Sequence, residues 1–132
     1  MQNHFLFLLA DGFEETEMVV PFDILLRGGV KVSLASIRKE LNVKGAHGLL
    51  VKADVLLSDV DISLFSGVFL PGGGLGVENL RASEAVLDAV KGLDIPVMYN
   101  VQSGHGFPMI TIPMGAMCEM DTERRSIKWT RR

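Results

Sequence analysis

The stretch 68-VFLPGGGLGVENL-80 decides the fold, because an apolar run passes directly into a proline and three glycines. The run at its start has the character of a buried strand, and Leu75 to Leu80 can begin the helix that follows. Because glycines lack a Cβ, such a loop can bring backbone N–H groups close to a phosphate or oxyanion at a helix N-terminus. A strand-to-helix turn can also be rich in glycine only because the connection is tight. The stretch therefore predicts a strand, a loop and a helix, and leaves anion binding open.

A second segment, near the N-terminus, has the same form. The run His4 to Ala10 is apolar and fits an interior strand of a parallel sheet. It ends at Asp11-Gly12, and three acids follow: Glu14, Glu15 and Glu17. Acids in a first helical turn suit the helix dipole, so capping explains most of them.

Glu17 differs from the other acids in its surroundings. It is followed by apolar residues at helical spacing, so its carboxyl group is expected to be partly desolvated. Pro21 has no N–H to donate to the carbonyl group of Glu17, four residues earlier, so the helix should be distorted at the acid. An acid held in this way suits general acid/base chemistry. Alternatively, Pro21 is the first residue of the helix and Glu17 lies in an exposed loop before it.

Composition limits the class of protein. A chain of 132 residues, 48% of them hydrophobic and with a net charge of -3, fits one globular domain with an apolar core. The charge pattern predicts no nucleic-acid partner, and the N-terminus lacks the pattern of a signal peptide, so we expect a cytoplasmic protein without a membrane partner. The single cysteine, Cys118, and the histidine spacing predict no disulfide and no metal site, and His47 is expected to be a turn or dimer-contact residue.

Strand and helix signals alternate along the chain. After His4 to Leu9, a helix is expected to end at Arg27-Gly28-Gly29, and Lys31 to Ser36 reads as the next strand. The remaining predicted elements are a hairpin or excursion over 43–55, a helical turn over 59–64, a helix capped by Ser83 and ending at Gly92, and a strand over 95–101. This order predicts a mostly parallel sheet covered by helices on both faces, with ligands at the carboxyl ends of the strands.

Several segments together resemble the ThiJ/PfpI superfamily, and within it the branch of the parkinsonism-associated protein deglycase and its bacterial relatives. The resemblance covers roughly residues 3 to 97 and rests on these motifs: 10-ADGFEETE-17 with Pro21 and Asp23, 46-AHG-48 with Val51 and Asp54, and 70-LPGGGLG-76 with Asn79-Leu80. It implies a flavodoxin-like α/β sandwich, a homodimer, and cofactor-free glyoxalase or deglycase chemistry. The substrate would be a small 2-oxoaldehyde such as methylglyoxal, or a glycated adduct, attacked by a cysteine thiolate.

The same resemblance assigns roles to three residues. Glu17 matches the family acid that is protonated and hydrogen-bonds the thiolate, Gly73 matches the glycine whose N–H helps to form the oxyanion pocket, and Gly72 is its neighbour. Elementary chemistry agrees, because attack on an aldehyde creates an alkoxide that fixed N–H donors stabilise, and a neutral carboxyl group can donate or move a proton.

The nucleophile is where the chain departs from the family. Val101 stands where the resemblance expects the cysteine, and valine cannot attack a carbonyl group. Ser103, in the run Ser-Gly-His-Gly, and Cys118 are the remaining candidates. We therefore divide the chain into a ThiJ/PfpI-like domain over 1–97 and a divergent tail over 98–132. The tail is genuinely diverged, frameshifted, a retained intron, or disordered, and the α/β fold is expected to be incomplete at its C-terminal side.

Three functional classes follow from this sequence. The first is an enzyme of the glyoxalase or deglycase class, inactive as written because its nucleophile is lost or misrepresented. The second is a non-catalytic chaperone-like or stress-response binding protein of the same fold. The third is a glutaminase-like amidotransferase domain, which has a related sheet and cysteine turn.

Overall fold

The computed structural model describes residues 3–93, 117–121, 123–124 and 126–130. The chain divides into two compact units, Met1–Leu93 and Asp94–Arg132. The strand predicted over 95–101, together with Val101 and Ser103, lies outside the described residues. The boundary between 97 and 98 also falls there, so the proposed domain division and the origin of the tail stay predictions.

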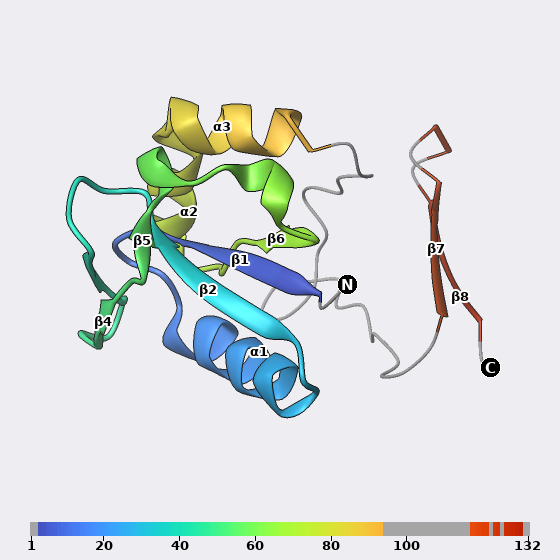
Figure 1. Cartoon of the computed structure of the whole chain (residues 1–132), viewed down its shortest axis with the longest axis horizontal. Helices are drawn as coiled ribbons and strands as arrows, with labels where there is room; N and C mark the ends of the chain where they lie inside the picture. Colours follow the sequence, from blue (N-terminus) through green and yellow to red (C-terminus); the bar gives the residue numbers. More distant parts are fainter. Residues whose placement is uncertain (1–2, 94–116, 122, 125, 131–132) are drawn as a thin grey trace. The chain divides into compact units, whose positions relative to one another are not determined.

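The first unit is built on a parallel sheet with the strand order β5-β2-β1-β6. The central strand β1 (His4–Leu9) pairs in parallel with β2 (Lys31–Ser36) on one side and with β6 (Gly67–Phe69) on the other. The short strand β5 (Val55–Leu56) extends the sheet beyond β2. The predicted parallel sheet is therefore confirmed in this unit (Figure 1).

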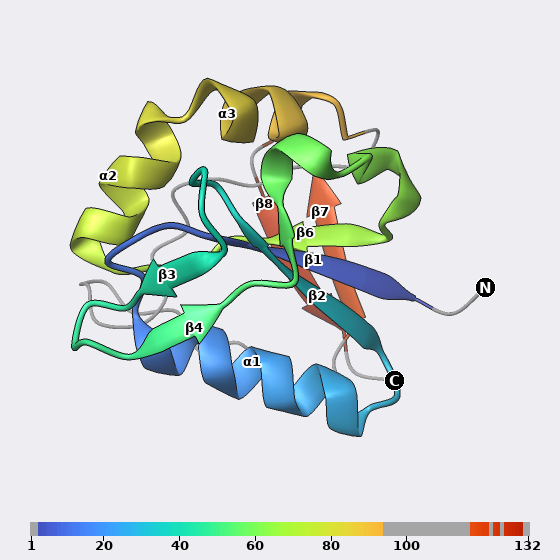
Figure 2. The same ribbon diagram turned by 60° about the vertical axis from the view of Figure 1, so that its left-hand side comes forward.

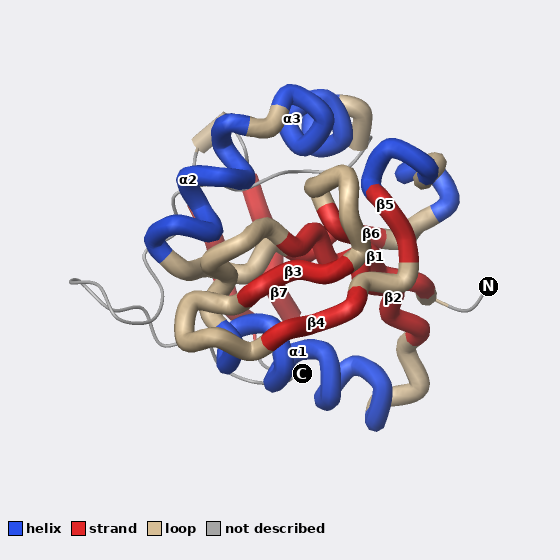
Figure 3. Tube along the Cα trace, turned by 90° about the vertical axis from the view of Figure 1, so that its left-hand side faces the viewer, coloured by secondary structure: helices blue, strands red, loops and turns tan. Residues whose placement is uncertain are grey.

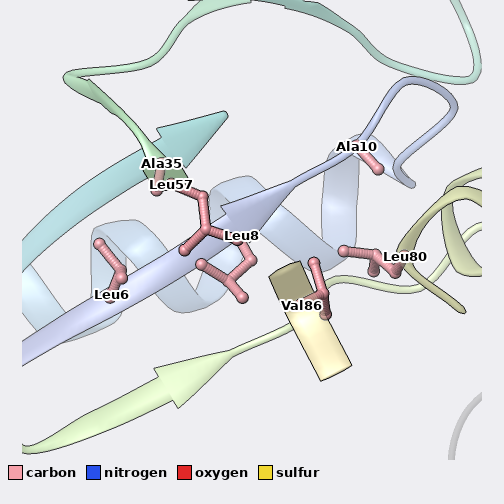
Figure 4. Packing of buried hydrophobic residues seen from close by; sticks show 7 residues of the cluster. All are labelled: Leu6, Leu8, Ala10, Ala35, Leu57, Leu80 and Val86. Atoms are coloured by element: carbon pink, nitrogen blue, oxygen red, sulfur yellow. The ribbon is translucent and has the colours of Figure 1, made fainter. Parts of the chain in front are cut away.

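Side chains of β1 alternate between two apolar clusters on opposite faces of the sheet. Leu6 and Leu8 belong to one cluster, which also includes Ala10, Ala35, Leu57, Leu80 and Val86 (Figure 4). Phe7 and Leu9 belong to the other, which also includes Phe13, Met18, Leu34, Val43 and Ala53. These four residues of β1, Leu6 to Leu9, are 0% exposed, as expected for a strand buried on both faces.

Helices cover both faces, as predicted. The helix α1 (Glu15–Arg27) packs through Met18 on the phenylalanine-containing cluster. The helices α2 (Gly74–Ala82) and α3 (Glu84–Lys91) pack on the other face, where they contribute Leu80 and Val86 (Figures 1 and 2). The hydroxyl group of Ser83 accepts a hydrogen bond of 3.3 Å from Val86 N, which confirms it as the N-cap of α3.

Pro21 lies inside α1, so the alternative that it begins the helix is wrong. Glu17 consequently stands in the first turn of α1, not in an exposed loop before a helix. No described helix is long and apolar enough to cross a membrane.

The segment between β2 and β6 forms the predicted excursion. The antiparallel strands β3 (Asn42–Lys44) and β4 (Leu50–Lys52) are joined by a turn that contains His47 (Figure 3). Two 3-10 turns, η1 (Leu57–Asp59) and η2 (Ile62–Leu64), then lead to β6. The turn between β3 and β4 lies against the start of α1, where it positions His47 beside Glu15.

In the second unit, β7 (Met117–Asp121) and β8 (Ser126–Thr130) form an antiparallel hairpin. Cys118 is in β7, and its backbone is in register with that of Trp129. The N–H of Arg124 donates a hydrogen bond of 2.9 Å to Asp121 Oδ1 in the connecting turn.

Candidate functional site

Glu17 and the glycine-rich loop meet at the carboxyl ends of β1 and β6. The N–H of Gly72 donates a hydrogen bond of 2.8 Å to Oε2 of Glu17, which is partly buried. In return, the carbonyl group of Gly72 accepts a hydrogen bond of 2.8 Å from Glu14 N. The peptide at Gly72 is therefore fixed on both sides by the start of α1.

Further hydrogen bonds join the two loops. Gly76 N donates to the carbonyl oxygen of Gly12 at 3.1 Å, and the side-chain amide of Asn79 donates to the carbonyl oxygen of Asp11 at 2.9 Å. Gly12 has a φ of 82°, a conformation that residues with a side chain rarely adopt. These contacts hold the segment after β1, which leads into α1 and Glu17, against the start of α2.

Gly72 has no room for a side chain. A Cβ at this position would overlap the carboxylate of Glu17. Only glycine allows the carboxylate to approach the loop this closely. The close approach of Glu17 is therefore a reason for a glycine at position 72.

Gly73 follows at the N-cap of α2, with a φ of 109° and a ψ of 129°. A Cβ here would lie 2.7 Å from Glu14 N, and it would also overlap the carbonyl oxygen of Gly12. Within the described part of the chain, the N–H of Gly73 makes no hydrogen bond. It stands at a helix N-terminus, where free N–H groups and the helix dipole favour an anion.

The geometry gives Glu17 and Gly73 complementary capacities. Oε2 of Glu17 accepts from Gly72 N, and a carboxyl group is a side chain that can act in general acid/base chemistry. The N–H of Gly73 can stabilise a negatively charged oxygen. Together they offer a carboxyl group and a backbone donor for an oxyanion.

A second group of polar side chains lies at the start of α1. His47 Nδ1 is 2.8 Å from Oε2 of Glu15, and His47 N donates a hydrogen bond of 2.6 Å to Oε1 of the same carboxylate. Desolvation opposes ionisation of Glu15, but the hydrogen bonds from His47, together with those from the backbone of Glu15 and Leu49, outweigh it and lower the pKa of Glu15 from 4.5 to about 2. The hydrogen bond to Glu15 and the nearby charge of Glu14 raise the pKa of His47 above 6.5.

A cavity of about 340 Å³ lies at the carboxyl ends of β1 and β2. It is lined by Asp11, Ile37, Arg38, Asn79, Ala82 and Ser83. The guanidinium group of Arg38 lies 2.9 Å from Asp11 Oδ2, so the two charges in the lining are paired. The cavity does not include Glu17, Gly72 or Gly73, so it is separate from the predicted site.

The structure thus brings together Glu17, Gly72 and Gly73 in the first unit. Ser103 and Val101 lie outside the described residues, and Cys118 is in the hairpin of the second unit. The sequence interpretation missed the cluster of Glu14, Glu15 and His47, because 32 residues separate Glu15 from His47 and no local pattern links them. The short motif 46-AHG-48 was the only available signal.

Comparison with known proteins identifies the fold of the first unit. The profile of the DJ-1/PfpI family matches residues 3–94, and that of the LD-carboxypeptidase C-terminal domain matches residues 69–120. The chain is 41% identical over 86 residues to protein DJ-1 homolog B of Arabidopsis thaliana, a match that covers 65% of this chain and 20% of that protein. It is 31% identical over 112 residues to the deglycase PfpI of Pyrococcus furiosus, covering 85% of this chain and 66% of that one.

Solved structures agree with these relatives. Oxidised DJ-1 of Toxoplasma gondii superposes with a TM-score of 0.64 and 35% identity, covering 67% of this chain and 48% of that one. The chain therefore spans only part of the length of the relatives that it matches. The mixed α/β fold with its mostly parallel sheet is that of these flavodoxin-like neighbours. With a family profile matched over residues 3–94, the chain belongs to the DJ-1/PfpI family.

Proposed function

We propose that this chain carries the acid and the oxyanion donor of a glyoxalase or deglycase site, for 2-oxoaldehydes such as methylglyoxal or for their protein adducts. The observation that carries the proposal is the hydrogen bond from Gly72 N to Glu17 Oε2, directly beside Gly73, whose N–H has no hydrogen-bond partner among the described residues. Relatives named as deglycases support the reaction class. The site needs no cofactor in this proposal.

The proposed roles of Gly73 and Glu17 follow from the chemistry of the carbonyl group. A nucleophile that attacks the aldehyde carbon turns the carbonyl oxygen into an alkoxide, which the N–H of Gly73 would stabilise. Glu17 would then donate a proton to this oxygen or move the proton on the adjacent carbon. Because Val101 occupies the position that the resemblance gives to the cysteine, the covalent step lacks its thiolate there, and Ser103 and Cys118 are the candidate nucleophiles.

Methylglyoxal consumption by the full chain tests the proposal. The variants are Glu17→Gln, Ser103→Ala, Cys118→Ala and Val101→Cys. If the chain is active, Glu17→Gln should lower kcat/KM about 100-fold or more, the scale of a lost general acid/base. Loss of turnover in Ser103→Ala or in Cys118→Ala would identify the nucleophile. Equal rates for the unaltered chain and Glu17→Gln would refute a catalytic role for Glu17.

The Val101→Cys variant distinguishes two explanations of an inactive chain: that only the nucleophile is missing, or that the site is assigned wrongly. If the acid and the oxyanion donor are as proposed, a cysteine at position 101 should create turnover that a second change, Glu17→Gln, removes. A Val101→Cys variant that is as inactive as its parent, while remaining folded, would count against the assignment of position 101.

A second candidate function is a non-catalytic, chaperone-like or stress-response protein of the same fold. The valine at position 101 favours it, because the thiolate is missing from the position that the resemblance gives to the cysteine, while Glu17 and Gly73 remain. Its test is suppression of the heat-induced aggregation of a client protein by a chain that shows no methylglyoxal turnover. A cytoplasmic homodimer without nucleic-acid or membrane partners is part of both proposals.

A further inference from the structure

Three side chains of types that can bind metals come together at the start of α1 from two distant segments. Glu14 is the N-cap of the helix, Glu15 is its first residue, and His47 comes from the turn between β3 and β4. This turn lies beside the start of α1 (Figures 2 and 3). One imidazole nitrogen and one oxygen from each carboxylate all lie within 4.8 Å of one another. This cluster is not part of the Glu17 and Gly73 site.

The separations of the donor atoms suit a single small cation. His47 Nδ1 lies 2.8 Å from Oε2 of Glu15 and 3.8 Å from Oε2 of Glu14. Nitrogen and oxygen ligands bound tetrahedrally to zinc at about 2.0–2.2 Å lie about 3.3–3.5 Å apart. The two observed distances bracket this value, so small side-chain rotations would place all three atoms around one ion.

The turn that carries His47 is held in place by bonds that do not involve the imidazole ring. His47 N donates to Oε1 of Glu15 at 2.6 Å, and Ala46 N donates to the carbonyl oxygen of Phe13 at 2.9 Å. Gly45 has no space for a Cβ because the Glu15 side chain occupies it. The backbone of His47 is therefore held beside the two acids by contacts that remain when Nδ1 binds another partner.

The surroundings of Glu14 distinguish this cluster from a simple helix cap. Its side chain is only 24% exposed and its Oε2 faces the same His47 nitrogen that Glu15 already occupies. Within the described residues, its other contact is a long one of 3.5 Å from the hydroxyl group of Thr16, and no lysine or arginine lies within 4.0 Å. One imidazole N–H cannot satisfy two carboxylates, whereas a divalent ion between them would.

We propose that Glu14, Glu15 and His47 bind one divalent transition-metal ion of the zinc class. The imidazole ligand favours zinc over magnesium or calcium, which prefer sites made only of oxygen. Three protein ligands leave a fourth position for water. Binding uses the lone pair of Nδ1, so a proton on this atom moves to solvent from the imidazolium or to Nε2 in the neutral ring. The ion would link the first turn of α1 to the turn between β3 and β4.

Isothermal titration of the full chain with zinc chloride, after removal of metal with EDTA, tests the proposal. One zinc ion per chain is expected, and magnesium chloride at the same concentration should give at least 100-fold weaker binding. Glu14→Gln is the decisive variant, because the Glu15–His47 hydrogen bonds that hold the turn do not involve the Glu14 side chain. It should weaken zinc binding at least tenfold, and His47→Gln should do the same or more. Glu78→Gln, an exposed acid in α2, is the matched control and should bind zinc unchanged.

Several results would overturn the site. They are zinc binding that is unchanged in both Glu14→Gln and His47→Gln, binding that only Cys118→Ser removes, and an unaltered chain that binds no zinc. Unfolding curves recorded without metal show whether each variant is folded. Cobalt gives an independent measurement: the visible spectrum of the cobalt-loaded chain should change in Glu14→Gln and remain the same in Glu78→Gln.

Discussion

Gly72 and Glu17 are 55 residues apart in the sequence, and the backbone N–H of the first donates a hydrogen bond of 2.8 Å to Oε2 of the second. The contact fits only because Gly72 has no Cβ, which would overlap the carboxylate. One acid in the first turn of α1 is thereby fixed by the loop that precedes α2. Its orientation is a property of the fold and does not depend on a ligand.

Two variants of Glu17 should separate its role in stability from its role in chemistry. Glu17→Gln keeps an oxygen that can accept from Gly72 N, so the free energy of unfolding should change by less than about 1 kcal/mol. Glu17→Ala leaves the partly buried N–H without its acceptor and should lower the free energy of unfolding by about 1–3 kcal/mol. Urea unfolding of the two variants measures the difference, and equal losses would show that the hydrogen bond does not determine the stability of this site.

Gly73→Ala should be strongly destabilising, because the φ of 109° and the nearby backbone of Gly12 and Glu14 both exclude a Cβ. The expected loss is about 1–3 kcal/mol, the usual cost of such a strained backbone conformation. Gly74→Ala is the matched control, since a Cβ at the next position has nothing within 4 Å and lies in the helix α2. That change should be neutral or stabilising by up to about 1 kcal/mol. Thermal or urea unfolding gives both values, and similar losses for the two glycines would contradict the geometry.

The ionic contact between Glu15 and His47 predicts a defined pH dependence of stability. The pKa of Glu15 is lowered from 4.5 to about 2, so its contribution is present above pH 4.5 and is lost as the pH falls toward 2. The pKa of His47 is raised above 6.5, so its contribution is present below pH 6.5 and is lost as the pH rises through the folded value. The contact should therefore stabilise the fold most between these limits, at mildly acidic pH.

Urea unfolding of the full chain and of His47→Gln, both in EDTA, measures this dependence. The difference in unfolding midpoint should be largest near pH 5–6 and shrink on either side. An NMR titration of the imidazole should have a midpoint above 6.5. A midpoint at or below this value, or a difference that does not vary with pH, would contradict the contact.

The sequence predicted most of the first unit because its elements carry strong local signals. The apolar run of β1, the glycines after α1 and the serine before α3 placed the ends of these elements as the structure has them. The proximity of Glu17 and Gly72 could also be predicted from the sequence, because both residues follow strands of one parallel sheet. The contact of Glu15 with His47 was not, because it depends on how the excursion of β3 and β4 folds back over α1.

The predicted homodimer can be tested through the exposed face of α1. Val20 and Ile24 are 52% and 49% exposed and lie one helical turn apart, so they form an apolar surface on the helix. If a second copy of the chain covers this surface, Ile24→Asp should shift the full chain from dimer to monomer in sedimentation velocity, because a buried unpaired carboxylate is costly. Leu87→Asp is the control, since Leu87 is 43% exposed but belongs to α3 on the other side of the sheet. A dimer that survives Ile24→Asp and dissociates in Leu87→Asp would place the interface on α3, and a chain that is monomeric without any change would refute the homodimer.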